Sequence, residues 1–222
     1  EWEDMSERIA FWADMEGPYV TYDNNYIESE WWSLKQLSEK GLLYKGYKVV
    51  PYCPRCGTAL SSHEVAQGYK DVKEKSAIVR FQVAGKENLY LLAWTTTPWT
   101  LPSNLGLCVN AKEEYDTVAA DGVEYILAKA LVETHFGEDA DIRSTCLGAD
   151  LVGMEYVPLF PLPQNVILDK KAFLVVADPY VTLTEGTGIV HIAPAFGEDD
   201  NRVCRQNGLP FVNLVDSHGQ FV

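Results

Sequence analysis

The residues best suited to chemistry stand in the stretch 94–104, which reads Trp-Thr-Thr-Thr-Pro-Trp-Thr-Leu-Pro-Ser-Asn. Its main feature is a run of three threonines, Thr95, Thr96 and Thr97, at the end of an apolar segment. Two prolines follow, and because each fixes φ and removes an amide donor, the chain must turn sharply. Such a turn, with its hydroxyls and the Asn104 amide, can hold sugar hydroxyls and a water. A strand edge with solvated hydroxyls is the alternative interpretation.

A second stretch, 186–200, combines glycines, a histidine and an acidic run. Gly186 and Gly188 allow the backbone to approach a ligand closely or to pack tightly. His191 ends an apolar segment, and Asp200 follows it. Each of these two residues alone has an ordinary alternative, a structural histidine and a helix cap or surface charge. Their chemical meaning therefore depends on what lies beside them.

Together, the two stretches resemble the connective editing insertion of the isoleucyl-tRNA synthetase family. Related valyl and leucyl domains place arginine and an acidic residue around the first proline, where this chain has Thr97 and Trp99. They also tend to have lysine or methionine at the position of His191. The segments 41–60 and 61–65 resemble the isoleucyl enzymes as well. The resemblance thus covers nearly the whole chain.

The resemblance implies a hydrolase that removes wrongly attached valine from the isoleucine-specific tRNA and excludes isoleucine by size. Valyl-adenylate is a second candidate substrate. The implied partners are the 3′ end of the aminoacylated tRNA and the remainder of the synthetase. The family's synthetic motifs of the His-Ile-Gly-His and Lys-Met-Ser-Lys-Ser types are absent, so ATP binding is expected only of a full-length enzyme. A module that binds the tRNA 3′ end without catalysis and a valyl or leucyl editing domain are the alternatives.

The resemblance also implies a role for each residue. Asp200 pairs with the α-ammonium of the substrate, and His191 lines the side-chain pocket. Trp99 either shapes that pocket or packs beneath the turn. Backbone amides at Gly186 and Gly188 are candidates for an oxyanion site. The remaining polar side chains hold the terminal adenosine and position the attacking water; they are Thr95, Thr96, Thr97 and Asn104.

The pair Cys53 and Cys56 has the spacing of a zinc knuckle. A structural zinc site needs four ligands, and beyond His63 as a candidate third ligand the chain offers no second pair. We therefore expect an incomplete site with zinc absent or weakly held, and no cofactor for hydrolysis. A zinc-ribbon module without catalysis is the alternative. The five cysteines do not form a disulfide framework, which favours a reducing cytoplasm.

Composition limits the classes of function. The 222 residues carry a formal net charge of −14, which argues against a surface that grips long nucleic acid. A pocket for one or two terminal nucleotides remains compatible with it. With 47% hydrophobic residues the chain can bury a core, and it contains no apolar run long enough to span a bilayer. We expect a monomer that does not associate with membranes.

The elements that must position these residues are many short strands and a few helices, which predicts an α+β, β-barrel-like domain after an N-terminal connective segment. We place the boundary between residues 1–75 and 76–222. Helices are expected at 27–43, ending near Gly41, and at 128–136. The sequence Asp121-Gly122 predicts a hairpin turn. The predicted strands are 77–83, 89–95, 116–120, 123–128, 173–177 and 188–192.

Overall fold

The computed structural model describes residues 1–222, and their contacts divide the chain into two compact units, Glu1–Tyr47 and Lys48–Val222. The first unit holds two helices, α1 (Trp2–Arg8) and α2 (Asn24–Glu39). None of its residues is buried. The hydrophobic core of the chain therefore belongs to the second unit.

Helix α2 confirms the helix expected at 27–43, although it begins earlier and ends earlier. The Asp23 carboxylate caps its start by accepting a backbone N–H two residues later at 2.8 Å. At its end, Gly41 has a φ of +70°, and the N–H of Leu42 donates to the carbonyl of Leu37 at 3.0 Å. This is a Schellman arrangement, in which glycine tolerates the left-handed conformation that satisfies the last carbonyls.

The second unit begins with a small hairpin and a short helix. Strands β1 (Tyr52–Cys53) and β2 (Thr58–Ala59) pair antiparallel. Helix α3 (Ser62–Gly68) follows, and Ser61 and Glu64 form a capping box at its start. In this arrangement each side chain accepts the backbone N–H of the other residue, which satisfies two donors of the first turn.

Eight strands form the main mixed sheet, in the order β8-β6-β7-β4-β10-β5-β9 with β3 paired to β4. Their bounds are β3 (Ala77–Gln82), β4 (Leu89–Thr95), β5 (Gly106–Val109), β6 (Glu114–Ala120), β7 (Val123–Ala128), β8 (Asp141–Leu147), β9 (Leu174–Ala177) and β10 (Val190–Ile192). The sheet thus begins close to the expected boundary at residue 75. The contacts instead place residues 48–75 in the same compact unit as the sheet, and the division at residue 75 stays a prediction.

Strand β4 is the centre of the sheet because it has three neighbours. One edge pairs along its whole length with β3. The other edge is shared, since Leu89–Leu91 pair with β7 and Trp94 pairs with β10, both in parallel. The sheet therefore branches at β4 into an arm of β7, β6 and β8 and a curved part that contains β10, β5 and β9.

The segment 153–157 closes the curved part into a barrel. It bonds to β3 and the residues just after it on one side, and to β9 and the residue just before it on the other, through backbone hydrogen bonds of 2.8–3.0 Å. These bonds are Val157 N to Gln82 O, Ala84 N to Glu155 O, Tyr156 N to Phe173 O and Val175 N to Met154 O. Strands β3, β4, β10, β5 and β9 and this segment form a closed ring, which confirms the expected barrel-like character.

The hairpin of β6 and β7 has the turn that its sequence predicts. Asp121 and Gly122 have φ values of +54° and +81°, as a type I′ turn requires at both central positions. The helix expected at 128–136 is also present, as a 3₁₀ turn (Lys129–Leu131) followed by α4 (Val132–Phe136). Gly137, with a φ of +82°, ends it.

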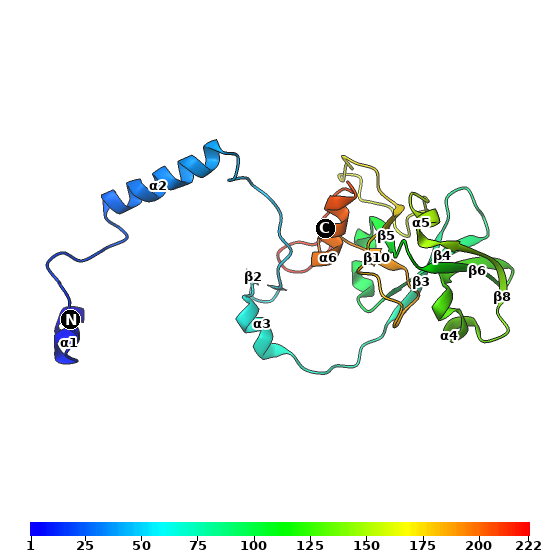
Figure 1. Cartoon of the computed structure of the whole chain (residues 1–222), viewed down its shortest axis with the longest axis horizontal. Helices are drawn as coiled ribbons and strands as arrows, with labels where there is room; N and C mark the ends of the chain where they lie inside the picture. The colour runs from blue at the N-terminus through cyan, green and yellow to red at the C-terminus, as the bar shows by residue number, and fades with distance from the viewer. The chain divides into compact units, whose positions relative to one another are not determined.

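The barrel interior and the base of the arm share the main hydrophobic core. Its fully buried members include Phe81, Leu91, Leu107, Tyr115 and Val175. Helix α5 (Gly148–Leu151) contributes Leu151 to it. Helix α6 (Glu198–Gln206) lies beside β10 and β5 (Figure 1), where Val203 and Cys204 pack against the outer side chains of the barrel.

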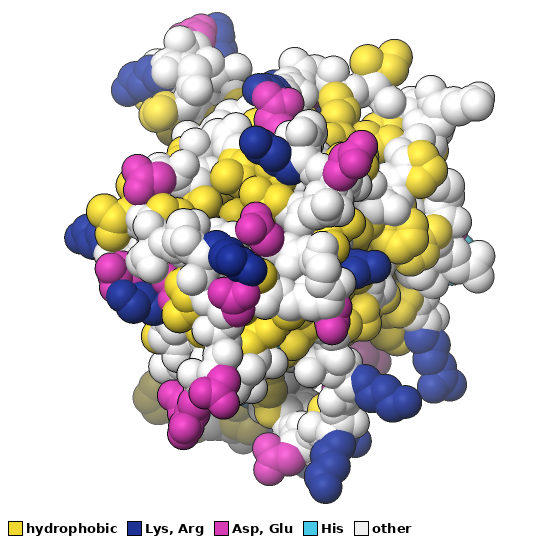
Figure 2. Space-filling model, turned by 90° about the vertical axis from the view of Figure 1, so that its right-hand side faces the viewer, with side chains coloured by type: hydrophobic (Ala, Val, Ile, Leu, Met, Phe, Trp, Pro, Cys, Tyr) yellow, Lys and Arg dark blue, Asp and Glu magenta, His cyan; other side chains and the backbone are white.

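The architecture confirms the α+β class, with strands dominating and helices at the periphery. Strands β9 and β10 begin later than expected because Phe173 and Gly188 adopt positive φ values of +60° and +71°. No helix is both long enough and apolar enough to cross a membrane. On the face of the second unit that carries β8, acidic and basic side chains are interspersed with apolar ones (Figure 2).

Candidate active site

The two polar stretches meet at one place, because β10 lies between β4 and β5. Val190 is paired with Trp94 of β4 and with Cys108 of β5, and His191 is paired with Leu107. The end of β4, which carries the threonines, is therefore next to the histidine on β10. Segments 96 residues apart in the sequence, at Trp94 and Val190, are joined here by backbone pairing rather than by loops.

The threonine run leaves β4 and turns into a 3₁₀ helix, Pro98–Ser103, as the prolines predict. Thr95 is buried, and its Oγ1 accepts the N–H of Thr97 at 3.1 Å. Thr96 and Thr97 are exposed. Of the three predicted threonines, Thr95 shapes the turn, and the other two present hydroxyls to solvent.

His191 is held on both ring nitrogens. Its Nε2 lies 2.7 Å from Thr100 Oγ1, and its Nδ1 lies 3.2 Å from Asn104 Nδ2. The Asn104 amide also donates to the carbonyl of Gly106 at 2.8 Å and accepts the Tyr156 hydroxyl at 2.6 Å. Both polar atoms of the Asn104 side chain are thus engaged inside the protein. Its predicted contact with adenosine stays a prediction.

These partners determine where the protons lie. The carbonyl of Gly106 can only accept, so the Asn104 nitrogen faces it, and this nitrogen must also donate to His191 Nδ1. A neutral ring then carries its proton on Nε2 and donates to Thr100. The Thr100 hydroxyl proton is left for the carbonyl of Thr97, 2.9 Å away. Burial lowers the pKa of His191 to about 4, which keeps the ring neutral near pH 7.

Asp200 lies in the first turn of α6 and points back toward β10. Its Oδ2 accepts the N–H of Ala193 at 2.9 Å. Burial raises the pKa of the Asp200 carboxyl to about 6, although the bond from Ala193 opposes the shift. Gly197 makes room for the carboxyl, since a Cβ there would lie 2.8 Å from its carbon. Arg202 anchors the helix by donating to both oxygens of Asp178 at 2.7 and 3.1 Å.

The two predicted glycines permit close packing behind the site. A Cβ on Gly186 would lie 3.0 Å from the Trp94 ring, and a Cβ on Gly188 would lie 2.3 Å from the Cβ of Ala128. The carbonyl of Gly188 accepts the Tyr115 hydroxyl at 2.7 Å. Both glycines therefore fit the tight-packing interpretation, and an oxyanion role for their amides stays a prediction.

Trp99 and Phe196 connect the two stretches on the outside. Their ring centroids are 4.9 Å apart at an angle of 64°, an edge-to-face contact. Trp99 is 52% exposed, so this contact covers only part of its ring. Both interpretations of Trp99, a packing role and a surface for a ligand, are compatible with this position.

Two residues of the network were not singled out from the sequence. Thr100 lies in the threonine turn, and its place three residues after Thr97 in a 3₁₀ turn is a signal that was available. Tyr156 had no such signal, because it lies 52 residues away from its partner Asn104. Only the barrel closure brings the tyrosine to the site.

A family model described as tRNA synthetases class I (I, L, M and V) matches residues 1–195, which is most of the chain. The chain belongs to this family.

Among class I synthetases, similar relatives are isoleucine–tRNA ligases. That of Clostridium tetani is 58% identical and that of Clostridium acetobutylicum 60% identical, each over 221 residues. The matches cover 100% of this chain but 21% of each relative. The synthetase chain described here thus spans about a fifth of the length of these curated relatives.

Some solved structures also match part of the chain at low sequence identity. The structure described as "GlLeuRS-CP1" is 17% identical, with a TM-score of 0.48, over 60% of this chain and 63% of that one. The cytosolic leucyl-tRNA synthetase editing domain of P. knowlesi is also 17% identical, with a TM-score of 0.47, over 64% and 65% of the two chains.

The cysteine pair of this synthetase chain lies at the β1–β2 hairpin. The N–H of Cys56 donates to Cys53 Sγ at 3.2 Å, and a hydrogen bond between the two thiols lowers the pKa of Cys53. His63 is on the exposed surface of α3, where its Nε2 contacts Gln67 at 2.7 Å. No group of three metal-ligating side chains is assembled. Two of the four ligands of a zinc site are present, and zinc binding stays a prediction.

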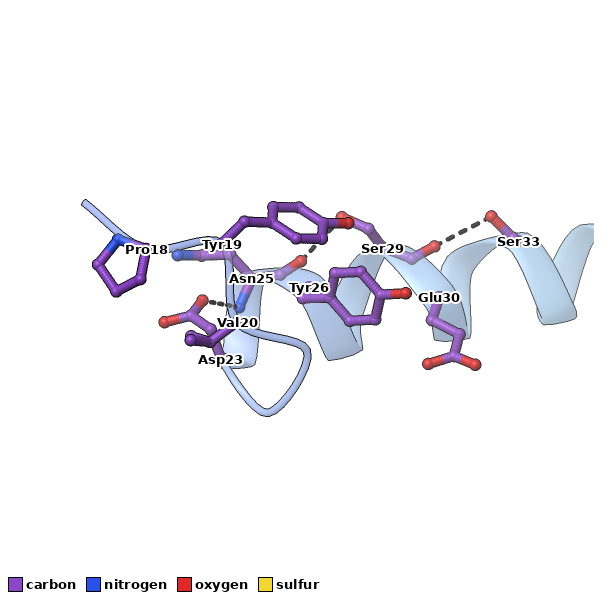
Figure 3. A pocket seen from close by; sticks show the side chains of 9 residues that line it. All are labelled: Pro18, Tyr19, Val20, Asp23, Asn25, Tyr26, Ser29, Glu30 and Ser33. Atoms are coloured by element: carbon purple, nitrogen blue, oxygen red, sulfur yellow. Dashed lines mark hydrogen bonds between the residues drawn. The ribbon is translucent and has the colours of Figure 1, made fainter. Parts of the chain in front are cut away.

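A surface hollow in the first unit lies along the start of α2 and contains none of the predicted site residues. The rings of Tyr19 and Tyr26 meet edge to face there, with centroids 5.5 Å apart (Figure 3). The Asp23 carboxylate on its wall is already used as the helix cap. A second hollow surrounds the β6–β7 turn. The candidate site is thus separate from both.

Proposed function

We propose that the chain is the editing segment of an isoleucine–tRNA ligase and that it hydrolyses the ester between valine and the tRNA of the isoleucine acceptor. The observation that carries this proposal is the convergence of the threonine turn, His191 and the Asp200 carboxyl at one end of the barrel. Water adds to the ester carbonyl, the ester bond breaks, and free valine and the tRNA 3′-terminal ribose hydroxyl are released.

Asp200 is the anchor for the α-ammonium group of the substrate. With a pKa of about 6, its carboxyl is mainly ionised at pH 7. One of its oxygens accepts the N–H of Ala193, and the other is free for a charge-assisted bond to the ammonium. Because every aminoacyl ester carries this ammonium, the contact positions the substrate without selecting its side chain.

His191 supplies selection by size. Since both nitrogens are bonded within the protein, the ring meets a substrate through its carbon atoms. The same two bonds prevent the ring from rotating aside for a larger side chain. A hydrophobic pocket extracts only about 1–3 kcal/mol from one methylene, a magnitude known from this enzyme family rather than from this structure. In a second, smaller site, a rigid His191 ring excludes the isoleucine side chain, so that only the wrongly attached valine is hydrolysed.

The exposed hydroxyls of Thr96 and Thr97 orient the terminal ribose and the attacking water. An aminoacyl ester is already activated, so no nucleophilic side chain is required. Positioning of the water against the carbonyl supplies the acceleration. Cys108 is not a candidate nucleophile, because burial raises the pKa of its thiol to about 12.

The partners in this proposal are the 3′ end of the charged tRNA and the remainder of the synthetase. Because the net charge is −14, we expect the chain alone to bind tRNA weakly and to edit inefficiently. All five cysteines are free, which fits the proposed reducing cytoplasm. Elemental analysis of the purified chain tests the zinc half-site, and stoichiometric zinc would show that further ligands are recruited.

The decisive experiment is deacylation of valyl-tRNA and isoleucyl-tRNA, both of the isoleucine acceptor, by the chain at high concentration. Loss of valine with isoleucine retained is the expected result. Asp200→Asn should abolish the activity, while Asp199→Asn, its exposed neighbour that pairs with Arg202, should retain it. Hydrolysis of neither ester together with binding of a non-hydrolysable valyl-adenosine analogue would indicate a binding module instead.

A further inference from the structure

A buried tyrosine on the barrel-closing segment reaches the candidate site. Tyr156 is 3% exposed, and its ring makes edge contacts with Phe81 and Phe173 at 5.2 and 6.2 Å. Its hydroxyl donates to Asn104 Oδ1 at 2.6 Å. The ring is therefore fixed by packing, and its single proton is directed at the amide that holds His191.

We propose that Tyr156 is a positioning residue of this site, which acts through the Asn104 amide to fix the orientation and the tautomer of the His191 ring. The inference rests on the proposed function for its consequence in selectivity, but its structural part can be tested without any substrate.

The direction of each hydrogen bond determines how the Asn104 amide is oriented. An amide group can rotate by 180°, which exchanges its oxygen and nitrogen. At Asn104 the hydroxyl of Tyr156 on one side and the carbonyl of Gly106 on the other favour the same orientation. That orientation directs an N–H at His191 Nδ1, which must then be unprotonated.

Without the Tyr156 hydroxyl, Asn104 Oδ1 becomes a buried acceptor with no donor, because the residue is 5% exposed. Turning the amide would then give its oxygen a donor at a protonated His191 Nδ1, at the cost of the bond to the carbonyl of Gly106, so the preference for the original orientation falls. Such a ring is free to change tautomer or to take up a second proton. Its bond to Thr100 is no longer fixed in direction.

The test is Tyr156→Phe in the 222-residue chain, since this change removes the hydroxyl and keeps the ring contacts. Nitrogen-15 NMR of the histidine rings reports the tautomer and the pKa directly, and His191→Gln assigns the signal. We expect a single Nε2–H tautomer in the unmodified chain and an Nδ1–H form or a mixture in the variant. The pKa of His191 should rise by about one unit.

Tyr115→Phe is the matched control. Tyr115 is also fully buried, but its hydroxyl contacts the carbonyl of Gly188 and the N–H of Asn110 rather than Asn104. It should leave the His191 tautomer unchanged. An unchanged tautomer and pKa in Tyr156→Phe would overturn the proposal. If that variant does not fold, a His191 ring that titrates near pH 6.5 in the unmodified chain would also overturn it.

The consequence for selectivity is read from the ratio of the two deacylation rates. In Tyr156→Phe, hydrolysis of isoleucyl-tRNA relative to valyl-tRNA should rise about tenfold, because the His191 wall is no longer rigid. A general loss of stability would lower both rates together and leave the ratio unchanged. If the chain hydrolyses neither ester, the proposed function fails while the NMR result still decides the role of Tyr156.

Discussion

At the scale of single residues, burial moves the two titratable groups of the site in opposite directions. It raises the pKa of Asp200 to about 6 and lowers the pKa of His191 to about 4. Near pH 7 the carboxyl is therefore charged and the ring is neutral. The two side chains thus contribute one negative charge and no positive charge, which suits a substrate with an ammonium group.

Asp200→Asn should increase stability while removing activity. Since the folded-state pKa lies above the ordinary value of 3.8, stability falls as pH rises from about 4 to about 6, and the full cost is present above that. The amide can still accept the N–H of Ala193. We expect a gain of about 1–2 kcal/mol in the free energy of unfolding at pH 7.5 and none at pH 4.

Urea unfolding at the two pH values measures this gain, with Asp199→Asn as the control. Asp199 is exposed and pairs with Arg202 at 3.0 Å, so its removal should change stability by less than about 1 kcal/mol. Equal stability of Asp200→Asn and the unmodified chain at pH 7.5 would mean that burial does not destabilise the ionised Asp200 carboxylate.

His191→Ala should admit isoleucine at a cost in stability. The change opens space in the wall and removes one hydrogen-bond partner each from Asn104 Nδ2 and Thr100 Oγ1, which keep their bonds to the carbonyls of Gly106 and Thr97. We expect a loss of about 2–4 kcal/mol in the free energy of unfolding and measurable hydrolysis of isoleucyl-tRNA. His218→Ala, on the exposed tail, is the control for both measurements. Intact isoleucyl-tRNA after incubation with folded His191→Ala would argue against the wall.

At the scale of elements, β10 brings the two polar stretches together because it pairs with the end of β4 on one side and with β5 on the other. It is only three residues long, and the glycines before it bring the chain close to β7. The glycines therefore determine where His191 lies.

Gly188→Ala should disrupt this placement, and Gly85→Ala separates the two causes. Both glycines have positive φ, +71° and +74°, so both substitutions carry backbone strain of about 1 kcal/mol. Only at Gly188 would the new Cβ collide, 2.3 Å from the Cβ of Ala128, while nothing lies within 4 Å at Gly85. We expect Gly188→Ala to lose at least about 2 kcal/mol more than Gly85→Ala in urea unfolding. Similar losses would show that the approach of β10 to β7 is easily relaxed.

The elements that the sequence predicted are those with local signals. Strand β4 and the β6–β7 hairpin follow from apolar runs and the Asp121-Gly122 turn. Strand β8 was not predicted because it lies at an edge with nearly all its side chains exposed, and α6 because it has too few apolar residues to show a helical period. The barrel closure by residues 153–157 depends on pairing with distant strands, so no local pattern reveals it or the role of Tyr156.

The candidate site was predictable to the same extent. The residue types in the two stretches indicated a polar site, and the structure brings His191, Thr95 and Asp200 to one end of the barrel. The sequence did not reveal that Asn104 faces inward, because burial of an amide depends on partners 52 and 87 residues away. Hydrogen-bond direction is a tertiary property that residue spacing does not encode.

At the scale of the whole molecule, the two units should differ in their contribution to stability. The first unit has no buried residue, and every core residue lies in the second. Deletion of residues 1–47 should therefore leave the unfolding free energy within about 1 kcal/mol and the deacylation rate unchanged. Thermal and urea unfolding of chain 48–222, compared with the full chain, measure this.

Deletion of residues 1–76 is the matched comparison, because it also removes the β1–β2 hairpin. There the Tyr52 hydroxyl donates to the carbonyl of Ser217 at 3.0 Å, and a Cβ on Gly219 would lie 3.0 Å from Pro54. Without these contacts the C-terminal tail should lose its protection from hydrogen exchange, while the barrel stays folded. If chain 48–222 fails to fold and chain 77–222 folds, the domain boundary does not lie between Tyr47 and Lys48, where the contacts divide the chain. It then lies at residue 75, where the composition changes. If both chains fold with a protected tail, the β1–β2 hairpin contributes nothing to the stability of the tail.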